Sequence, residues 1–358
     1  MYVVIMAGGG GTRLRPVSTA ARPKPFLPLL PTGETLLQGT VRRLQGLELG
    51  PTDLFVVAAS PYVALVEAQV PRATVVIEPE GRNTAAAIAL ATLAIERDDG
   101  DVMVVLPADH RIEPADEAGF RAVLQAAANG LTGHPFGIEL PLVTLGIQTA
   151  YAATQYGYLI PEGRGQAING LQAYPLEAFW EKPPIEDAER LWRMPGVAWN
   201  AGMFLWRRRA IRAALDAYAP DVVGAVARGL RDGSLDAAYA SITPRSIDYA
   251  VMEPAAAAGS VVMGALNVGW TDIGNWPALL EVLGASGIEG GVVEAGERAA
   301  ATDGDLVVER PPGGLVVREP GGGTITPDRP VALLRHARHA RAIVEALLDR
   351  CAAAEAGA

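Results

Sequence analysis

The chain begins with an apolar run, residues 2–7, that passes directly into four glycines, Gly8 to Gly11. An unbroken apolar run of this kind is typical of a strand that is buried on both faces of a parallel sheet. Glycine lets a ligand approach the backbone closely, and successive backbone N–H groups can then surround an anion. The start of the chain therefore predicts a parallel α/β sheet with an anion-binding loop after its first strand.

Further apolar runs at 53–59, 74–77 and 102–106 predict three more buried strands. Ahead of the last of these, the alanine-rich spacing over 84–97 predicts a helix with Asn83 as its N-cap. Strands that alternate with helices form right-handed β-α-β units. We therefore expect an α/β protein with a Rossmann-like, doubly wound sheet, whose ligands collect at the carboxyl ends of the strands.

The composition changes toward the C-terminal end of the chain. Asn275 is expected to cap a last helix of the first domain, with Pro277 in its first turn. Beyond residue 284, glycine-rich turns separate short apolar runs, which indicates a small β domain, and residues 336–354 predict a terminal helix. We therefore divide the chain into a catalytic domain, 1–283, and a small β and helical domain, 284–358.

The bulk composition excludes several classes of protein. A formal net charge of −10 argues against nucleic acid as a partner, because phosphate backbones are held by surplus lysine and arginine. No stretch approaches the roughly 18 uninterrupted apolar residues that a membrane helix needs, and the early glycines do not suit a signal peptide. A single cysteine, Cys351, fits a reducing compartment. We expect a cytoplasmic protein with no membrane partner.

Only two of the 30 basic residues are lysines, Lys24 and Lys182. Lys24 follows the glycine run, and Arg13 lies within the same segment. An arginine fork suits two phosphate oxygens, while a lysine supplies a compact charge, so a triphosphate suits this loop. The alternatives are a simple turn and a solvated lysine. The loop lacks the Gly-Lys-Ser/Thr of a P-loop, and Arg13 or Leu14 occupies the third glycine position of a dinucleotide fingerprint, which rules against an NAD-linked dehydrogenase.

Two aspartates are candidate metal ligands. Asp109 follows the strand at 102–106, and Asp272 lies in the loop ahead of the helix that Asn275 caps. Magnesium takes hard oxygen ligands and commonly uses only one or two protein carboxylates beside phosphates and water. A turn-forming aspartate is the alternative for Asp109. His110 has no partners at metal-ligand spacing, so we interpret it as structural and expect no zinc site.

Three short motifs suit a sugar, which is held by a few fixed polar groups with a small residue where the ring comes close. They contain Gly157, Glu181 and Asn200, and Lys182 could hold a sugar phosphate. The alternatives are an exposed Glu181–Lys182 ion pair, which contributes little, and a turn at Asn200.

Gly8 to Pro16 followed by Pro23-Lys-Pro25 resembles the pyrophosphorylase signature of the sugar nucleotidyltransferases. Glu78 to Ala91, with its Arg82-Asn-Thr84, and the residues 246–253 resemble the mannose-1-phosphate guanylyltransferases among them, and the resemblance covers roughly residues 2–280. Pro25 departs from the glutamine frequent in bacterial members and is more typical of relatives that use other nucleotides.

The resemblance implies a glycosyltransferase-A-like mixed sheet. It implies nucleotide contacts from Ala7, Gly8, Gly9, Gly11, Thr12, Arg82, Asn83, Thr84 and Ala108. It implies catalytic roles for Arg13, Lys24 and Lys182, sugar contacts from Gly157, Glu181 and Asn200, and Mg²⁺ binding by Asp109 and Asp272.

The implied reaction joins GTP and mannose-1-phosphate to give GDP-mannose and pyrophosphate. One alternative is another pair of substrates, such as dTTP or UTP with glucose-1-phosphate. A second is a catalytically silent regulatory subunit that senses a nucleotide sugar. The C-terminal segment could pair subunits into a homodimer or cover the core, and the sequence leaves both arrangements open.

If the two aspartates hold a divalent metal, EDTA should abolish pyrophosphate release from GTP and mannose-1-phosphate. Added magnesium should restore it, because two mutually repelling polyanions must be neutralised before they can react. A coupled pyrophosphate assay on the chelated and reconstituted protein makes the measurement. Activity that persists after thorough chelation would contradict the metal pair.

Overall fold

The computed structural model describes residues 1–356 of the chain, which form two compact units. Unit 1 contains residues 1–8, 44–107 and 112–270. Unit 2 contains residues 9–43 and 108–111 together with the chain from residue 271. The two-residue strands β5 (Arg111–Ile112) and β12 (Trp270–Thr271) contain points where the chain passes from one unit to the other. The division into domains at residue 283 stays a prediction.

Unit 1 is built on a ten-stranded sheet with the order β3-β2-β1-β4-β10-β6-β11-β9-β7, and β8 pairs with β9. Strands β1, β2, β3 and β4 are parallel, whereas β10 is antiparallel to β4 and β6. This arrangement confirms the predicted mixed, doubly wound α/β class. The strands are β1 (Tyr2–Met6), β2 (Leu54–Ala59), β3 (Thr74–Glu78), β4 (Val102–Pro107), β6 (Leu142–Gln148), β7 (Gly157–Pro161), β8 (Gln166–Ile168), β9 (Leu171–Glu181), β10 (Ala198–Arg207) and β11 (Val261–Ala265).

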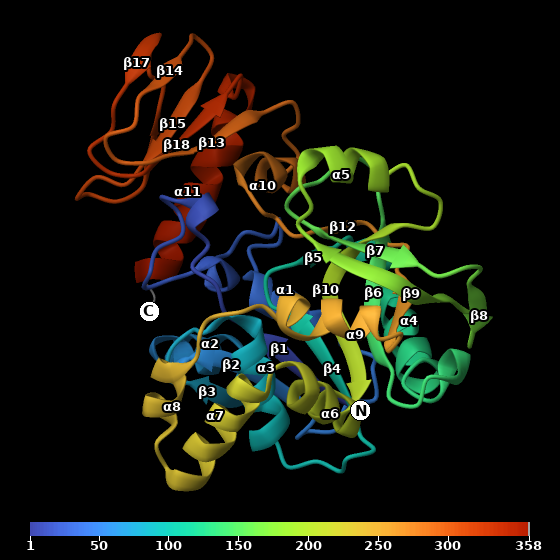
Figure 1. Ribbon diagram of the computed structural model, residues 1–358. Coiled ribbons are helices and arrows are strands. Elements are labelled where there is room, and N and C mark those ends of the chain that lie inside the picture. Colours follow the sequence, from blue (N-terminus) through green and yellow to red (C-terminus); the bar gives the residue numbers. More distant parts are fainter. Residues whose placement is uncertain (357–358) are drawn as a thin grey trace. The chain divides into compact units, whose positions relative to one another are not determined.

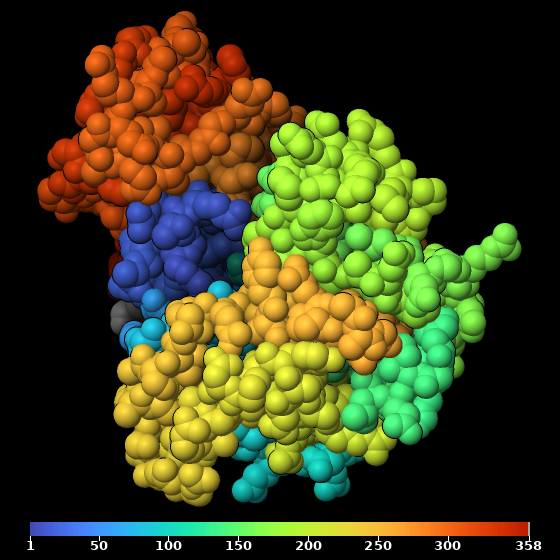
Figure 2. Space-filling model, in the orientation of Figure 1, coloured from blue at the N-terminus to red at the C-terminus, as the bar shows by residue number. Residues whose placement is uncertain are grey.

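Helices of unit 1 pack on this sheet and bury its apolar residues. The core includes Val4 of β1, Val105 of β4 and Trp206 of β10, all at most 1% exposed. Figure 1 shows α6, α7 and α8 gathered together, and their side chains form a continuous yellow surface in Figure 2. The helices are α2 (Val63–Gln69), α3 (Asn83–Ala94), α4 (Glu117–Gly130), α5 (Ile185–Leu191), α6 (Arg208–Tyr218), α7 (Pro220–Asp232), α8 (Leu235–Ser241) and α9 (Glu253–Ala257), with the π-helix η6 (Asp248–Met252) ahead of α9.

The start of α3 differs from the prediction. Arg82, not Asn83, is the N-cap, and Asn83 is the first helical residue with φ of 68°. The Asn83 side chain accepts a hydrogen bond from the next backbone N–H, that of Thr84, at 2.8 Å. Asparagine tolerates this left-handed conformation because its short polar side chain bonds locally. The residue therefore shapes the turn ahead of α3 rather than capping the helix.

Unit 2 combines the N-terminal loop segment with the C-terminal part of the chain. Its core joins Leu14 and Leu29 to Trp276, Leu334 and Leu347, all fully or almost fully buried. Figure 1 shows β13, β15 and β18 side by side, in the order β13-β18-β15-β16, and β14 pairs with β17. The elements are η1 (Thr12–Leu14), η2 (Lys24–Phe26), α1 (Leu36–Arg42), α10 (Trp276–Val282), β13 (Glu289–Val293), β14 (Ala299–Ala301), β15 (Leu306–Glu309), β16 (Val316–Arg318), β17 (Gly323–Ile325), β18 (Val331–Arg335) and α11 (Arg341–Ala356).

The N-terminal ends of α10 and α11 were both predicted from the sequence. Asn275 caps α10 as predicted, because its side chain accepts a hydrogen bond from the Ala278 N–H at 2.9 Å. The terminal helix begins at Arg341 rather than at 336, since His336 has a positive φ of 57° and a short 3-10 turn precedes α11. None of the helices in the described part of the chain is long and apolar enough to cross a membrane.

Candidate active site

The Lys24 ammonium group is the centre of a polar cluster in unit 2. It donates a hydrogen bond to Asp109 Oδ2 at 2.8 Å and another, shorter one to the backbone carbonyl of Asp272. The Lys24 side chain is only 8% exposed, and that of Asp109 is 29% exposed. A buried charge is tolerated when it is paired and hydrogen-bonded. One ammonium group therefore joins the two predicted metal ligands and leaves one of its three N–H donors for a further acceptor.

The glycine run makes room for this lysine. A Cβ atom on Gly11 would lie 2.8 Å from Lys24 Cβ, and Gly11 has a φ of 57°, which favours glycine. The Ser18 hydroxyl donates a hydrogen bond to the Gly11 carbonyl and so closes the loop between them. Any larger residue at Gly11 would displace Lys24.

Arg13 lies beside the loop that carries Asp272. Arg13 Nη1 is 3.2 Å from the position that a Cβ on Gly274 would occupy, and the Gly274 N–H donates to Asp272 Oδ1 at 3.0 Å. The Arg13 guanidinium is exposed, and within residues 1–356 the structure gives it no hydrogen bond or ion pair. Unit 2 thus brings Arg13, Lys24, Asp109 and Asp272 together.

The electrostatics of this cluster keep Asp109 ionised. Burial alone would raise the pKa of the Asp109 carboxyl, but the neighbouring Lys24 ammonium outweighs that effect and holds the pKa below its usual range. Burial lowers the pKa of His110 to about 4, against the opposing effect of the Asp109 carboxylate. His110 is therefore neutral at physiological pH, and its backbone carbonyl accepts a hydrogen bond from Arg43.

Other predicted nucleotide contacts are found in both units. In unit 1, the Ala7 N–H donates to the Val57 carbonyl at 2.9 Å, and Gly8 is exposed. In unit 2, Gly9 has a φ of 99°, Thr12 opens the exposed turn η1, and the Ala108 carbonyl accepts from Thr40 Oγ1 at 3.2 Å. Gly8 and Gly9 therefore have open space around them, and the positive φ of Gly9 is the backbone freedom that suits a phosphate-binding loop.

In unit 1 the predicted sugar residues lie at neighbouring positions of the sheet. Gly157 of β7 pairs directly with Glu181 of β9. A Cβ on Gly157 would lie 2.5 Å from Glu181 Oε2, so only glycine leaves space for this carboxylate. Glu181 is 7% exposed in its side chain and forms an ion pair with Lys182, which is 52% exposed. The ion pair that was the alternative interpretation is therefore present, but its acid is buried and only its base is exposed.

Asn200 of β10 is adjacent to the same strands, because Trp199 pairs with Tyr158 of β7. Its amide oxygen accepts hydrogen bonds from Thr144 Oγ1 at 2.8 Å and from the Gly202 N–H at 3.1 Å. Its Nδ2 donates to Asp248 Oδ1 at 2.9 Å. Asn200 is therefore held by partners on both sides of its amide group.

Several acidic groups surround this part of unit 1. Burial, and then the charge of Glu181, raise the pKa of Asp248 to about 6, while Lys182 opposes the shift. Burial also raises the pKa of Glu253, whose Oε1 accepts the Glu181 N–H at 2.8 Å. Burial alone would lower the pKa of Lys182, but the hydrogen bond to Glu181 outweighs it and raises that pKa. Lys182 is therefore charged and neutralises part of the cluster.

The predicted base-binding residues form the turn ahead of α3, also in unit 1. Arg82 Nε donates to Glu80 Oε1 at 3.1 Å, and Arg82 Nη2 donates to the Ala240 carbonyl at 3.4 Å. Asn83 is exposed, and Thr84 Oγ1 accepts the Ile247 N–H at 2.8 Å. The turn is thus tied to the segment that leads directly into Asp248.

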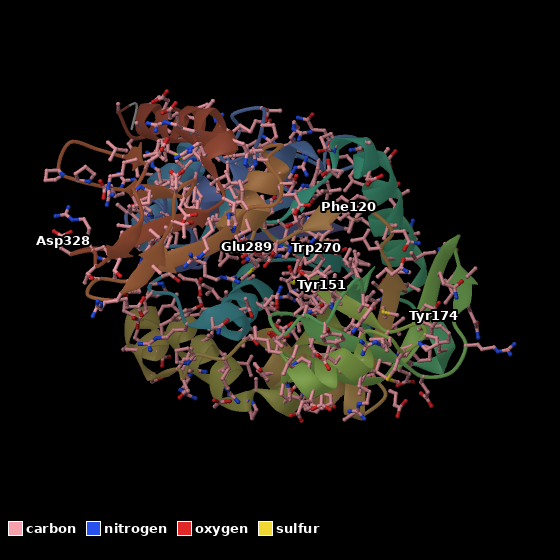
Figure 3. The ribbon with its side chains drawn as sticks, turned by 90° about the horizontal axis from the view of Figure 1, so that it is seen from above. Phe120, Tyr151, Tyr174, Trp270, Glu289 and Asp328 are labelled. Atoms are coloured by element: carbon pink, nitrogen blue, oxygen red, sulfur yellow. The ribbon has the colours of Figure 1, made fainter. Side chains whose placement is uncertain are left out.

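A row of aromatic rings lies beside Gly157 and Asn200. Ring centroids are 4.8 Å apart for Tyr151 and Trp199, 5.3 Å for Trp199 and Tyr156, and 5.4 Å for Tyr156 and Trp270. Figure 3 labels Tyr151 and Trp270, which stand at the two ends of this row. Trp199 and Tyr156 are the sequence neighbours of Asn200 and Gly157, so the row is carried by the same motifs as the predicted sugar residues.

Sequence reasoning did not assign roles to Asp248, Thr144, Glu253 or the aromatic row. Trp199 and Asn200 are neighbours in one motif, so the tryptophan could have been included with it. Asp248 lies in the 246–253 segment that resembles the guanylyltransferases, but no spacing rule connects it to Asn200, 48 residues earlier. Among the described residues, no group of three or more histidine, cysteine or acidic side chains is arranged to hold a metal ion by itself.

The chain is similar to known proteins over most of its length. The Nucleotidyl transferase family matches residues 2–286. Mannose-1-phosphate guanylyltransferase ManC of Salmonella typhimurium is 37% identical over 301 residues, which cover 79% of this chain and 59% of that protein. A mannose-1-phosphate guanylyltransferase of Sinorhizobium fredii is 35% identical over 321 residues, which cover 85% of this chain and 59% of that protein. The chain therefore spans less than two thirds of the length of these curated relatives.

A solved structure is similar as well. The crystal structure of a Thermus thermophilus protein named mannose-1-phosphate geranyltransferase has a TM-score of 0.69 and 33% sequence identity. The similarity covers 80% of this chain and 79% of that one.

The substitution Gly157→Ala tests the packing of Glu181. Its Cβ would lie 2.5 Å from Glu181 Oε2 and 3.1 Å from Phe179 Cε1, so the carboxylate must move. We expect the free energy of unfolding, measured by urea denaturation, to fall by about 1–3 kcal/mol, as is typical of overpacking. The matched control is Gly119→Ala on α4, where no described atom lies within 4 Å of the new Cβ. Equal stability of Gly157→Ala and wild type would contradict this packing.

Proposed function

Because this chain belongs to the nucleotidyl transferase family, we propose that it joins the GMP part of GTP to mannose-1-phosphate. The products are GDP-mannose and pyrophosphate. The observation that carries the proposal is the cluster of unit 2, in which one buried ammonium group joins Asp109 and Asp272 while Arg13 lies beside them. The cluster thus sets an ordered lysine and an exposed arginine beside a glycine loop, which suits the phosphates of a nucleoside triphosphate.

The chemistry needs little proton transfer. A phosphate oxygen of the sugar 1-phosphate forms a bond to the α-phosphorus of GTP, and the bond from that phosphorus to the bridging oxygen of pyrophosphate breaks. The attacking oxygen is already anionic, so no general base is required. The protein must align two polyanions and stabilise the charge of an in-line displacement. We assign contacts with the β and γ phosphates to Arg13 and Lys24, and contact with the sugar phosphate to Lys182.

The donor set of unit 2 fits a divalent cation. Asp109 stays ionised beside Lys24, which also binds the Asp272 backbone carbonyl, and the Asp272 carboxyl accepts the Gly274 N–H, so the cluster contains two carboxyl groups of the hard-oxygen type. Two carboxylates together with phosphates and water are a usual set for magnesium. Asp109 and Asp272 would hold the ion. When bound, it supplies charge neutralisation and orientation of the phosphates.

Recognition of the sugar and the base is assigned to unit 1. The Glu181 carboxylate over Gly157 and the oriented amide of Asn200 suit paired hydroxyl groups. The turn with Arg82, Asn83 and Thr84 is assigned to the base. Mannose and guanine are supported by the names of the similar proteins, and they outweigh Pro25, the residue that is more typical of relatives using other nucleotides. The intact cluster around Lys24 argues against a silent regulatory subunit.

Lys24→Ala should lower turnover about 100-fold or more, as expected when one preorganised charge-stabilising donor is lost. The variant removes the ammonium group that joins Asp109 to the Asp272 carbonyl. Pyrophosphate release from GTP and mannose-1-phosphate is the measurement, made on protein whose circular dichroism spectrum matches that of wild type.

Arg228→Ala is the control, because this cation is exposed on α7 and belongs to no cluster described above. Its turnover should equal that of wild type. Wild-type turnover in folded Lys24→Ala would remove Lys24 from the reaction.

A further inference from the structure

The orientation of the Asn200 amide is determined by its hydrogen bonds. The Thr144 hydroxyl and the Gly202 N–H both contact Oδ1, and a backbone N–H can only donate, so this atom must be the oxygen. The other side must then carry the NH₂ group, which is the side that faces Asp248 Oδ1 at 2.9 Å. Thr144 is fully buried, so this anchor of the amide is shielded from water.

An amide NH₂ group has two N–H donors. Asp248 accepts one of them, and the described residues offer no partner to the second. Asn200 is partly exposed, so a ligand can reach its amide. The second N–H is therefore a donor of fixed direction for an oxygen atom of a ligand.

Asp248 itself is held in place by the segment before it. The Arg245 carbonyl accepts the Ala85 N–H at 3.2 Å, and the Ile247 N–H donates to Thr84 Oγ1 at 2.8 Å. Asp248 then opens the π-helix η6, a rare element that occurs frequently at functional sites. The acceptor of the Asn200 N–H is thus anchored to the first turn of α3.

Charged groups reach Asp248 from two elements. Glu181 and Lys182 come from the end of β9, Tyr249 follows Asp248 in η6, and the Ser246 side chain, just before η6, is hydrogen-bonded to Asp248. The Tyr249 hydroxyl donates to the Glu181 carbonyl at 3.2 Å, and Lys182 is paired with Glu181. Burial first and the charge of Glu181 second raise the pKa of Asp248, and the opposing effects of Lys182 and the Ser246 side chain do not cancel them.

We propose that Asp248 is a positioning residue for the sugar 1-phosphate. It accepts one N–H of Asn200 and so directs the second N–H toward a hydroxyl of the sugar ring. The inference rests on the proposed function, since it names the residue that prepares the sugar-binding amide. Asp248 acts through Asn200 and does not itself contact the substrate.

This role has a consequence for pH. The carboxylate form accepts the Asn200 N–H, whereas a protonated carboxyl is a weaker acceptor. Because the pKa of Asp248 is about 6, the sugar should bind less well as the pH falls below that value. The substrate phosphate also gains a proton near this pH, about 6 for phosphate monoesters, so its effect must be separated from that of Asp248.

The test compares Asp248→Ala, Asp248→Asn and the control Asp216→Asn, which removes an exposed carboxylate on α6. At pH 8, Asp248→Ala should raise the KM for mannose-1-phosphate about tenfold, as expected when the Asn200 N–H loses its acceptor. The KM for GTP should change less than twofold. Asp248→Asn should keep the wild-type KM, because its amide oxygen still accepts, and so should Asp216→Asn.

The pH profile gives the second readout. Protonation of the substrate affects both proteins alike, so the ratio of KM for wild type to KM for Asp248→Asn isolates the carboxyl group. This ratio should be near one at pH 8 and should rise as the pH passes below about 6. A ratio that does not change with pH would overturn the proposal.

Three kinetic results would also overturn it. The first is an equal increase of the KM for both substrates in Asp248→Ala. The second is a KM for mannose-1-phosphate in Asp248→Asn that is as high as in Asp248→Ala. The third is a loss of kcat in Asp248→Ala with both KM values unchanged. If the wild-type protein uses another sugar 1-phosphate, the proposed function fails, and the same comparison with that substrate still tests Asp248.

Discussion

A buried ammonium group must be matched by oxygen acceptors, and in this protein that requirement organises unit 2. Lys24 meets it with Asp109, 85 residues later, and with the carbonyl of Asp272, 248 residues later. Three segments that are remote in sequence are therefore held at one point. The glycine at position 11 follows from the same interaction, because a Cβ there would displace the lysine. The shape of the glycine loop and the positions of the two candidate metal ligands thus depend on the hydrogen bonds of the Lys24 ammonium group.

Unit 1 instead holds a carboxylate, that of Glu181, and an amide group, that of Asn200, in fixed orientations. Its sheet register places Gly157 opposite Glu181, and the missing side chain of the glycine gives the carboxylate its space. The amide of Asn200 is oriented by a buried hydroxyl and a backbone N–H on one side and by Asp248 on the other. A sugar is recognised through the directions of its hydroxyl groups, so rigid donors of this kind suit it better than flexible charged side chains.

Much of this arrangement could be predicted, because the determining signals are local. The apolar run before Gly8 predicts β1, and the position of Asp109 just after β4 predicts its place at a strand end. The cap at Asn275 also follows from adjacent residues. Asp248 could not be assigned, since its contact with Asn200 depends on how η6 packs against β10. Asn83 was misjudged because two local uses of its side chain, a cap and a left-handed turn, look alike in sequence.

A comparison of substrate pairs with the wild-type protein tests the proposed guanylyltransferase activity most directly. GTP, dTTP and UTP are each offered with mannose-1-phosphate and with glucose-1-phosphate, and the nucleotide sugar formed is identified alongside the release of pyrophosphate. If the proposed function is right, kcat/KM should be highest for GTP with mannose-1-phosphate, and the product should be GDP-mannose. A higher kcat/KM for dTTP or UTP with glucose-1-phosphate, or no product from any pair, would contradict it.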